Sequence, residues 1–192
     1  MKKKFIILFL LLIVPIKAFA LIEVDITRGN LNPLPLAVSP LSIDNKSKKS
    51  FEKIIKKENI GSEISIIVEN NLRTSGLFNP LNKDAFLQAP EIANLKPRFE
   101  DWNLIKAQAL ITGKVTYVNE KLRVEFRLWD ILAAKEMMAL AFTTVPSNWR
   151  RVGHIISDKV YERLTGEKGY FDTRIIYVAE EGPKTQRKKR LA

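Results

Sequence analysis

The side chains that most often perform chemistry in proteins are few or isolated in this sequence. His154 is the only histidine, and there is no cysteine. One histidine cannot build a histidine-rich metal site, and zinc–thiolate and iron–sulfur centres require cysteine. A serine triad would have to use His154, yet no serine lies in a Gly-x-Ser-x-Gly motif. An exported hydrolase is therefore a weak alternative, and the residues offer no metal or cofactor site.

Two pairs of adjacent carboxylates, Glu100-Asp101 and Glu180-Glu181, are the other candidates for acid–base chemistry. Neighbouring side chains on a helix or strand diverge, so both pairs are better interpreted as solvated charge. Neither Gly-x-Gly-x-x-Gly nor Gly-x-x-x-x-Gly-Lys occurs, which leaves phosphate cradles unsupported.

A net charge of +11 is typical of a nucleic-acid binder, but in this chain most of the excess positive charge lies near the two ends. Four lysines lie in the first twenty residues, and five cations lie between Lys184 and Arg190. The remaining body is nearly neutral. The basic run has no interleaved aromatic residue for base stacking and falls at an expected hairpin loop. A basic-tail nucleic-acid binder is thus the weaker reading, and we predict no nucleic-acid partner.

The first twenty residues have the pattern of an export signal. Lys2, Lys3 and Lys4 precede an apolar run over 5–14, Pro15 ends it, and Ala18 and Ala20 are the small residues of a cleavage site. A spanning helix would need about 20 apolar residues, roughly twice this run. We predict a signal peptide over 1–20 with cleavage after Ala20, a periplasmic mature protein, and no insertion in the membrane after processing. A lipid-anchored route lacks its cysteine.

After that cleavage the new N-terminus is an alternating apolar and polar segment, in which Ile22, Val24 and Ile26 alternate with Glu23 and Asp25. This is the period of a half-buried strand. Such a segment can be an ordinary first strand, or it can add to the edge of its own sheet or of another protein's sheet. The residues alone leave these possibilities open.

Two amphipathic helices are expected, one over 60–72 ending near Gly76 and one over 149–164 ending at Gly166, with Ser147 as the N-cap of the second. The proline-containing segment 34–41 is predicted as an edge strand. We expect 44–59 to be a solvated loop with a short helix opened by Ser50, 78–98 to be loop, and 99–107 to make one or two helical turns.

The clearest strand signal covers 109–145. Two alternating runs flank Asn119-Glu120, and a third follows the loop 132–135, which predicts an antiparallel meander. The expected fold class is α/β, with a mixed sheet whose C-terminal part is that meander and which two amphipathic helices cover.

Beyond Gly169 the pattern becomes strand again over 173–179, followed by a charged loop. A strand and a hairpin loop cannot bury their own apolar face. We therefore expect one α/β domain over 21–168 and the start of a second structural unit over 169–192.

An ordered set of fragments carries a resemblance to a known family: Ile-Thr-Arg-Gly at 26–29, Pro-Leu-Ala-Val at 35–38, Asn-Ile-Gly at 59–61, Asn-Leu-Arg-Thr-Ser-Gly at 71–76, Phe-Asn-Pro-Leu at 78–81, Ala-Leu-Ile-Thr-Gly-Lys-Val at 109–115, His-Ile-Ile-Ser-Asp at 154–158, and Val-Tyr-Glu-Arg-Leu-Thr-Gly-Glu-Lys-Gly at 160–169 followed by Phe-Asp-Thr-Arg-Ile-Ile-Tyr-Val at 171–178. Together they resemble the TolB family, the periplasmic components of the Tol–Pal cell-envelope system. The resemblance covers Leu21 to about Ala179.

The resemblance implies an α/β N-terminal domain followed by a six-bladed β-propeller, and no enzymatic activity. It implies a hub that links the inner-membrane protein TolA to the outer-membrane lipoprotein Pal, supports outer-membrane integrity and invagination during division, and is exploited in colicin import. In the family Pal binds the propeller, and this sequence ends where the first blade would begin, so the expected propeller is truncated and its Pal-binding part is missing here.

The resemblance also assigns a role to the mature N-terminal segment, which engages TolA in the family and whose exposure there responds to Pal. The segment is called the arm below. It consists of Leu21, Ile22, Glu23, Val24, Asp25, Ile26, Thr27 and Arg28.

Overall fold

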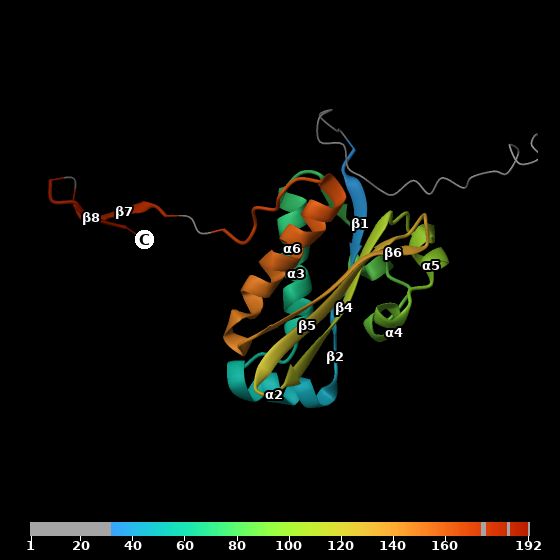
Figure 1. Ribbon diagram of the computed structural model, residues 1–192. Helices are drawn as coiled ribbons and strands as arrows, with labels where there is room; N and C mark the ends of the chain where they lie inside the picture. Colours follow the sequence, from blue (N-terminus) through green and yellow to red (C-terminus); the bar gives the residue numbers. More distant parts are fainter. Residues whose placement is uncertain (1–31, 174–175, 184, 192) are drawn as a thin grey trace, which may run out of the picture.

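The computed structural model describes residues 32–173, 176–183 and 185–191. Its centre is a mixed sheet in the order β3-β1-β4-β5-β6, with the short β2 also paired to β4 (Figure 1). The strands are β1 (Leu34–Val38), β2 (Ser42–Ile43), β3 (Phe78–Pro80), β4 (Ala109–Val118), β5 (Lys121–Asp130) and β6 (Lys135–Thr144). β1 pairs in parallel with β3 and with β4, and β2 also pairs in parallel with β4. The pairs β4–β5 and β5–β6 are antiparallel. The expected α/β class with a mixed sheet is confirmed.

The meander forms as predicted. β4 pairs with β5 over the full length of both strands, from Ala109↔Asp130 to Val118↔Lys121. Asn119 and Glu120 join them with φ of 50° and 60°, so both residues have the left-handed conformation that a two-residue hairpin turn requires. The β5–β6 pairing carries one irregularity, between Leu128 and Trp129.

The segment predicted as an edge strand lies inside the sheet, and that prediction is wrong. β1 pairs with β3 on one side and with β4 on the other. Pro35 is tolerated there because its pairing with β4 begins one residue later, at Leu36↔Ala109. The Pro35 carbonyl still accepts a hydrogen bond from Gln108 N at 3.0 Å, so the missing N–H costs no ladder bond. The edge position belongs to β3, which was predicted as loop.

One face of the sheet is covered by two long helices, α3 (Ile60–Thr74) and α6 (Trp149–Thr165), as expected (Figure 1). Both end at a glycine with φ of 75°, Gly76 and Gly166. The helices cross closely at Gly153, where a Cβ would lie 2.8 Å from Ile67 Cγ2. Ser147 is not the N-cap of α6, because a 3-10 turn, η2 (Pro146–Asn148), precedes the helix and Asn148 takes the cap position.

Helix α2 (Asn45–Ile55) replaces the solvated loop predicted over much of 44–59. Asp44, rather than Ser50, opens it: the Asp44 carboxylate accepts hydrogen bonds from Ser47 N at 2.9 Å and Ser47 Oγ at 2.7 Å. Phe51 is fully buried and meets the Tyr117 ring edge-on at 5.4 Å. The lysine-rich composition gave no sequence signal for this helix, which packs against the sheet through the buried residues Ser47 and Phe51.

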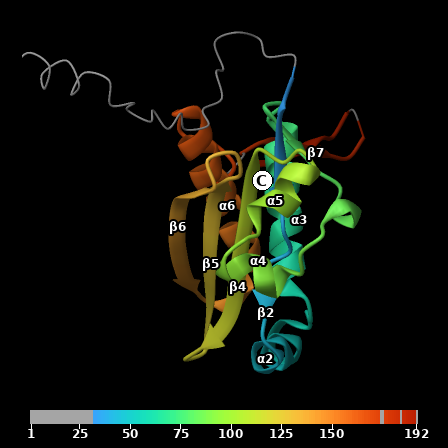
Figure 2. The ribbon, with the colours of Figure 1, turned by 90° about the vertical axis from the view of Figure 1, so that its right-hand side faces the viewer.

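The other face of the sheet carries a smaller layer made by α4 (Pro90–Leu95) and α5 (Phe99–Leu104). The expected helical turns at 99–107 are confirmed by α5, whereas α4 and the 3-10 turn η1 (Lys83–Ala85) lie in the segment predicted as loop. Trp102 is the centre of this layer; its Nε1 donates to Gln88 Oε1 at 2.9 Å, and its ring meets Phe86 edge-on at 4.9 Å. Figure 2 shows that this layer lies over only one end of the sheet.

After α6 the chain returns onto that helix. The Asp158 carboxylate accepts hydrogen bonds from Phe171 N at 2.6 Å and Asp172 N at 3.1 Å. A separate hairpin follows, with β7 (Val178–Glu181) paired to β8 (Lys188–Leu191). The strand expected over 173–179 thus starts at Val178 among the described residues, and part of the basic run lies in β8 rather than in a loop. Among the residues described, no helix has the length and apolar character to span a membrane.

Candidate functional site

The residues predicted as functional from the sequence, Ala18, Ala20 and the arm (Leu21–Arg28), lie outside the described residues. The first described residues, 32 and 33, lie just before β1. The described structure therefore shows which surfaces are available to the arm and to partners, and whether other side chains form a reactive site.

His154 lies in the seam between α3 and α6, where its surroundings define a structural role. Ser157 Oγ donates its proton to Gly153 O at 2.9 Å, so Asn71 Nδ2 must be the donor to Ser157 Oγ, also at 2.9 Å. The second Nδ2–H faces His154 Nδ1 at 2.9 Å. With this amide orientation Nδ1 is the acceptor, which corresponds to the tautomer that carries its proton on Nε2. Because the Ser157 hydroxyl already donates to Gly153 O, His154 serves in this network as a link between the two helices.

The adjacent carboxylates do not converge on a common point. Asp101 accepts hydrogen bonds from Arg98 Nε at 2.8 Å and Gln88 Nε2 at 3.3 Å. In the hairpin, Glu180 pairs with Arg187 at 2.7 Å and Lys189 at 2.9 Å, and Glu181 lies 3.5 Å from Arg190. Among the described residues, no group of three or more histidine, aspartate or glutamate side chains could hold a metal ion.

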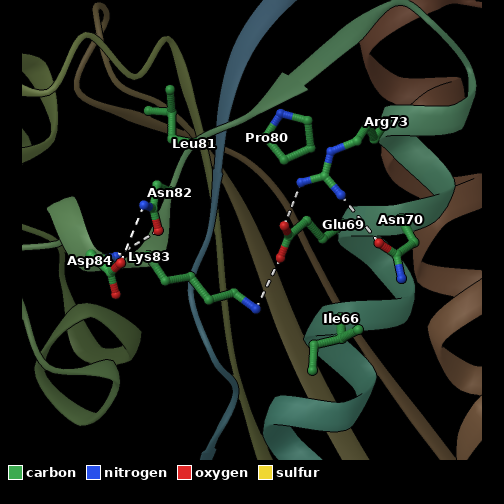
Figure 3. A pocket seen from close by; sticks show the side chains of 9 residues that line it. All are labelled: Ile66, Glu69, Asn70, Arg73, Pro80, Leu81, Asn82, Lys83 and Asp84. Atoms are coloured by element: carbon green, nitrogen blue, oxygen red, sulfur yellow. Dashed lines mark hydrogen bonds and ion pairs between the residues drawn. The ribbon is translucent and has the colours of Figure 1, made fainter.

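A charged pocket of about 530 Å³ between α3 and the β3–η1 connection was missed by sequence reasoning (Figure 3). At its centre Glu69 pairs with Arg73 at 2.6 Å and with Lys83 at 2.9 Å, one cation on each carboxylate oxygen. Partial burial raises the pKa of the Glu69 carboxyl, but the hydrogen bonds and charges of Lys83 and Arg73 outweigh it and hold that pKa below its usual value. The i,i+4 spacing of Glu69 and Arg73 was visible in the sequence, whereas the approach of Lys83 was not.

Both Glu69 oxygens are engaged, so this carboxylate is committed to its two ion pairs. The ion pairs attach the β3–η1 connection to α3. Ile66, Pro80 and Leu81 form the apolar part of the lining, and Asn82 caps η1 by accepting a hydrogen bond from Asp84 N at 3.1 Å. The arrangement is that of a structural network at the β3 edge of the sheet.

The outer edge of β6 is the other open feature. In the described part of the chain, β6 pairs only with β5 and ends the sheet (Figure 2). Ala139, Leu140 and Ala141, at the middle of the strand, are all exposed. Beside them on β5 lie Arg123 and Glu125, on the part of the face that α4 and α5 leave open, and Arg127, whose Nη1 donates to Asn94 O of α4 at 3.1 Å. This is a surface suited to contacts between proteins rather than to chemistry.

Comparison with known proteins identifies the relatives of this chain. A family model described as the TolB amino-terminal domain matches residues 22–137. The Tol-Pal system protein TolB of Pelagibacter ubique (strain HTCC1062) is 85% identical over 183 residues, which are 95% of this chain and 41% of that protein. The present chain thus spans less than half the length of this relative.

The crystal structure of TolB from Acinetobacter baumannii has the same fold over 84% of this chain and 36% of its own, with a TM-score of 0.65 and 23% identity. This likeness independently supports the arrangement of sheet and helices described above. Since the match to the TolB amino-terminal domain covers more than half of the residues, the chain belongs to the TolB family.

Proposed function

We propose that this protein is a non-enzymatic component of the Tol–Pal system that acts in the periplasm after removal of residues 1–20. The observation that carries the proposal is the 85% identity, over 95% of the chain, to a Tol–Pal system protein. In this role the protein links TolA to Pal, supports outer-membrane integrity and division, and is open to exploitation by imported colicins.

Export is tested by mass spectrometry of the protein recovered from the periplasmic fraction. We expect a mature N-terminus at Leu21. Replacing Ala18 and Ala20 by bulky residues should block cleavage, because the peptidase pocket accepts only small side chains at these positions. A protein that keeps Met1 in the wild-type sequence, or that stays in the membrane fraction, contradicts this part of the proposal.

The arm, Leu21–Arg28, is proposed as the TolA-binding segment, and strand addition as its mode of binding. An extended segment offers backbone donors and acceptors to a sheet edge, and Ile22, Val24 and Ile26 fill one face of the new pairing. Each buried apolar side chain contributes about 1.5–3 kcal/mol, and ordering costs about 1–2 kcal/mol per residue. The net affinity should be modest, as suits a reversible relay.

Calorimetric titration of the mature protein against the C-terminal domain of TolA tests the arm. Deleting residues 21–28 should abolish binding. If the arm is mostly undocked, the deletion should leave the thermal midpoint of the domain nearly unchanged. Val24→Pro should do the same, because proline removes a ladder donor and fixes φ. Asn79→Pro on β3 is a control that should leave binding intact. Equal affinity with and without the arm would place the contact elsewhere.

The hairpin β7–β8 is proposed as the first part of a β-propeller blade, and the Pal-binding surface as lying on the propeller that continues in longer relatives. Ile176, Tyr177, Val178 and Leu191 are between 56% and 77% exposed. Two of these apolar side chains lie in the hairpin and two lie just before it, and all four need further strands to cover them. Hydrogen exchange tests this: amides of β7 and β8 should exchange rapidly in the 192-residue chain and slowly in a chain extended to the length of its relatives.

A further inference from the structure

The segment that follows α6, residues 167–172, forms no helix or strand, yet both of its ends contact that helix. We call it the strap. At its start, Glu167 donates its backbone N–H to Thr165 Oγ1 at 3.1 Å. At its end, both carboxylate oxygens of Asp172 accept from Arg151 Nε at 3.1 Å. The strap therefore runs antiparallel to α6, from the last turn of the helix back toward its first.

The Asp158 carboxylate joins the strap to the middle of α6. One of its oxygens accepts the backbone N–H of Phe171 at 2.6 Å, and the other accepts that of Asp172 at 3.1 Å. Hydrogen bonds to a charged acceptor are stronger than those between neutral groups. A single side chain thus satisfies two successive N–H groups that in regular structure would be paired with the backbone. Asp158 sets both the position and the direction of the backbone at this point.

Gly169 allows the strap to come this close to the helix. A Cβ at this position would lie 2.5 Å from Asp158 Oδ1 and 2.6 Å from Asp158 Cβ, which is closer than non-bonded atoms pack. Gly169 is not among the glycines with positive φ, so its backbone conformation is open to other residues. The requirement for glycine is therefore steric, and it arises from the contact with Asp158.

Aromatic rings attach the strap to the core of the domain. The rings of Tyr170 and Phe171 meet Tyr161 of α6 edge-on, with centroids 5.5 and 5.8 Å away, an arrangement that aromatic pairs favour. Tyr161 is 8% exposed and meets Phe78 of β3 at 6.2 Å. Phe171 is therefore held twice, by its backbone at Asp158 and by its ring at Tyr161.

We propose that Asp158 is a positioning residue, which locks the strap onto α6 so that the chain leaves the α/β domain at Thr173 in one fixed direction. Relative motion is the default for two units of one chain that lack a large apolar interface. The strap opposes such motion at its origin, because polar and aromatic contacts fix its last two residues. It thereby limits the orientations open to the hairpin β7–β8 that follows. The inference goes beyond the proposed function, since it holds whichever segment binds TolA.

Amide hydrogen exchange of the processed protein tests the role of Asp158. Asp158→Ala should speed exchange at Phe171 and Asp172 at least tenfold more than at β4, whose amides report global unfolding. Lys159→Ala is the matched control, because Lys159 is the next residue of α6 and pairs with Glu162 on the same helix at 2.8 Å. It should leave both strap amides unchanged. Asp158→Asn keeps one acceptor oxygen and should give intermediate rates. Equal effects of Asp158→Ala and Lys159→Ala would overturn the proposal.

Spin labels measure the direction of the chain itself, and the sequence has no cysteine to interfere. Labels on Lys121→Cys, at the start of β5, and Thr173→Cys should give a narrow distance distribution in the otherwise unchanged protein. Asp158→Ala and Gly169→Ala should each broaden this distribution at least twofold. Gly169→Ala leaves the carboxylate in place and acts only through the steric clash, so it tests the same contact from the other side. Unchanged widths in both variants, or a broad distribution before either substitution, would overturn the proposal.

Discussion

The two faces of the central sheet are built for different purposes. Toward α3 and α6 the inward-facing apolar residues of β4 and β5 join one continuous core, which also takes in Phe51 of α2 and Phe78 of β3. Toward α4 and α5 a smaller cluster around Trp102, Leu110 and Trp129 covers one end of the sheet. The rest of that face carries Lys114, Arg123, Glu125 and Arg127 in solvent-accessible positions.

The difference between the faces shows that alternate residues of the same strands have different roles: one set is buried and stabilises the fold, and the other set forms the exposed surface. Since the side-chain period of a strand is two, Phe126 and Glu125 are neighbours in sequence and lie on opposite faces. The covered face sets the free energy of unfolding, and the open face is free to vary in charge.

The largest effect should come from removing a large side chain on the covered face. Phe126 is 1% exposed and stacks with Phe142 at 6.0 Å between ring centroids. Phe126→Ala should lower the free energy of unfolding by about 3–5 kcal/mol, because a cavity is left in a packed core. Glu125→Ala, on the open face, should cost about 0.5 kcal/mol or less. Urea unfolding measures both, and similar costs would refute the division of roles between the faces.

A smaller effect is expected from the polar seam within the covered layer. Asn71→Leu removes the donor shared by Ser157 and His154 and leaves His154 Nδ1 without that partner. The free energy of unfolding should fall by about 1–3 kcal/mol. Asn70→Leu is the control, because Asn70 is one residue away and, in the described contacts, its side chain bonds only to the exposed Arg73.

Nitrogen chemical shifts of His154 provide the second readout of the seam. In the wild-type protein they should report the tautomer with its proton on Nε2. The opposite tautomer would contradict the hydrogen-bond assignment, and with it the reason that Asn71 matters more than Asn70.

The smallest effect concerns the cap of α2, which attaches a charged helix to the covered face. Asp44→Ala should cost about 1 kcal/mol at neutral pH. The backbone hydrogen bond from Ser47, followed by the side-chain hydrogen bond from Ser47, lowers the pKa of the Asp44 carboxyl from 3.8. Because the folded pKa is lower than the unfolded one, this stabilisation is present above the unfolded pKa and is lost as pH falls through the folded pKa.

The difference between wild type and Asp44→Ala should therefore shrink as the pH falls below about 4. Asp44→Asn keeps an acceptor at the cap without an ionisable group, so its stability relative to Asp44→Ala should not show this pH dependence. Chemical unfolding at several pH values checks both. A pH-independent cost of Asp44→Ala would show that the charge contributes nothing to the cap.

The sequence by itself determined the elements that carry a strong local period. The apolar stripes of α3 and α6, their terminal glycines, and the alternation of β4 and β5 around Asn119-Glu120 are local signals, and the structure has each of them. The arm and the cleavage site were predicted in the same way, from alternation and from small residues at fixed spacing. They lie outside the described residues, so their roles stay predictions.

Only the tertiary structure decided which weak local signals became regular elements. Pro35 argued for an edge, but β1 lies inside the sheet because the proline precedes its pairing with β4. The lysines of α2 argued for a loop, but burial of Phe51 and the Asp44 cap stabilise a helix. β3 and α4 have no period of their own and form because β1 and the open end of the sheet offer them partners. The free edge of β6 also arises from strand order, a non-local property that no window of sequence contains.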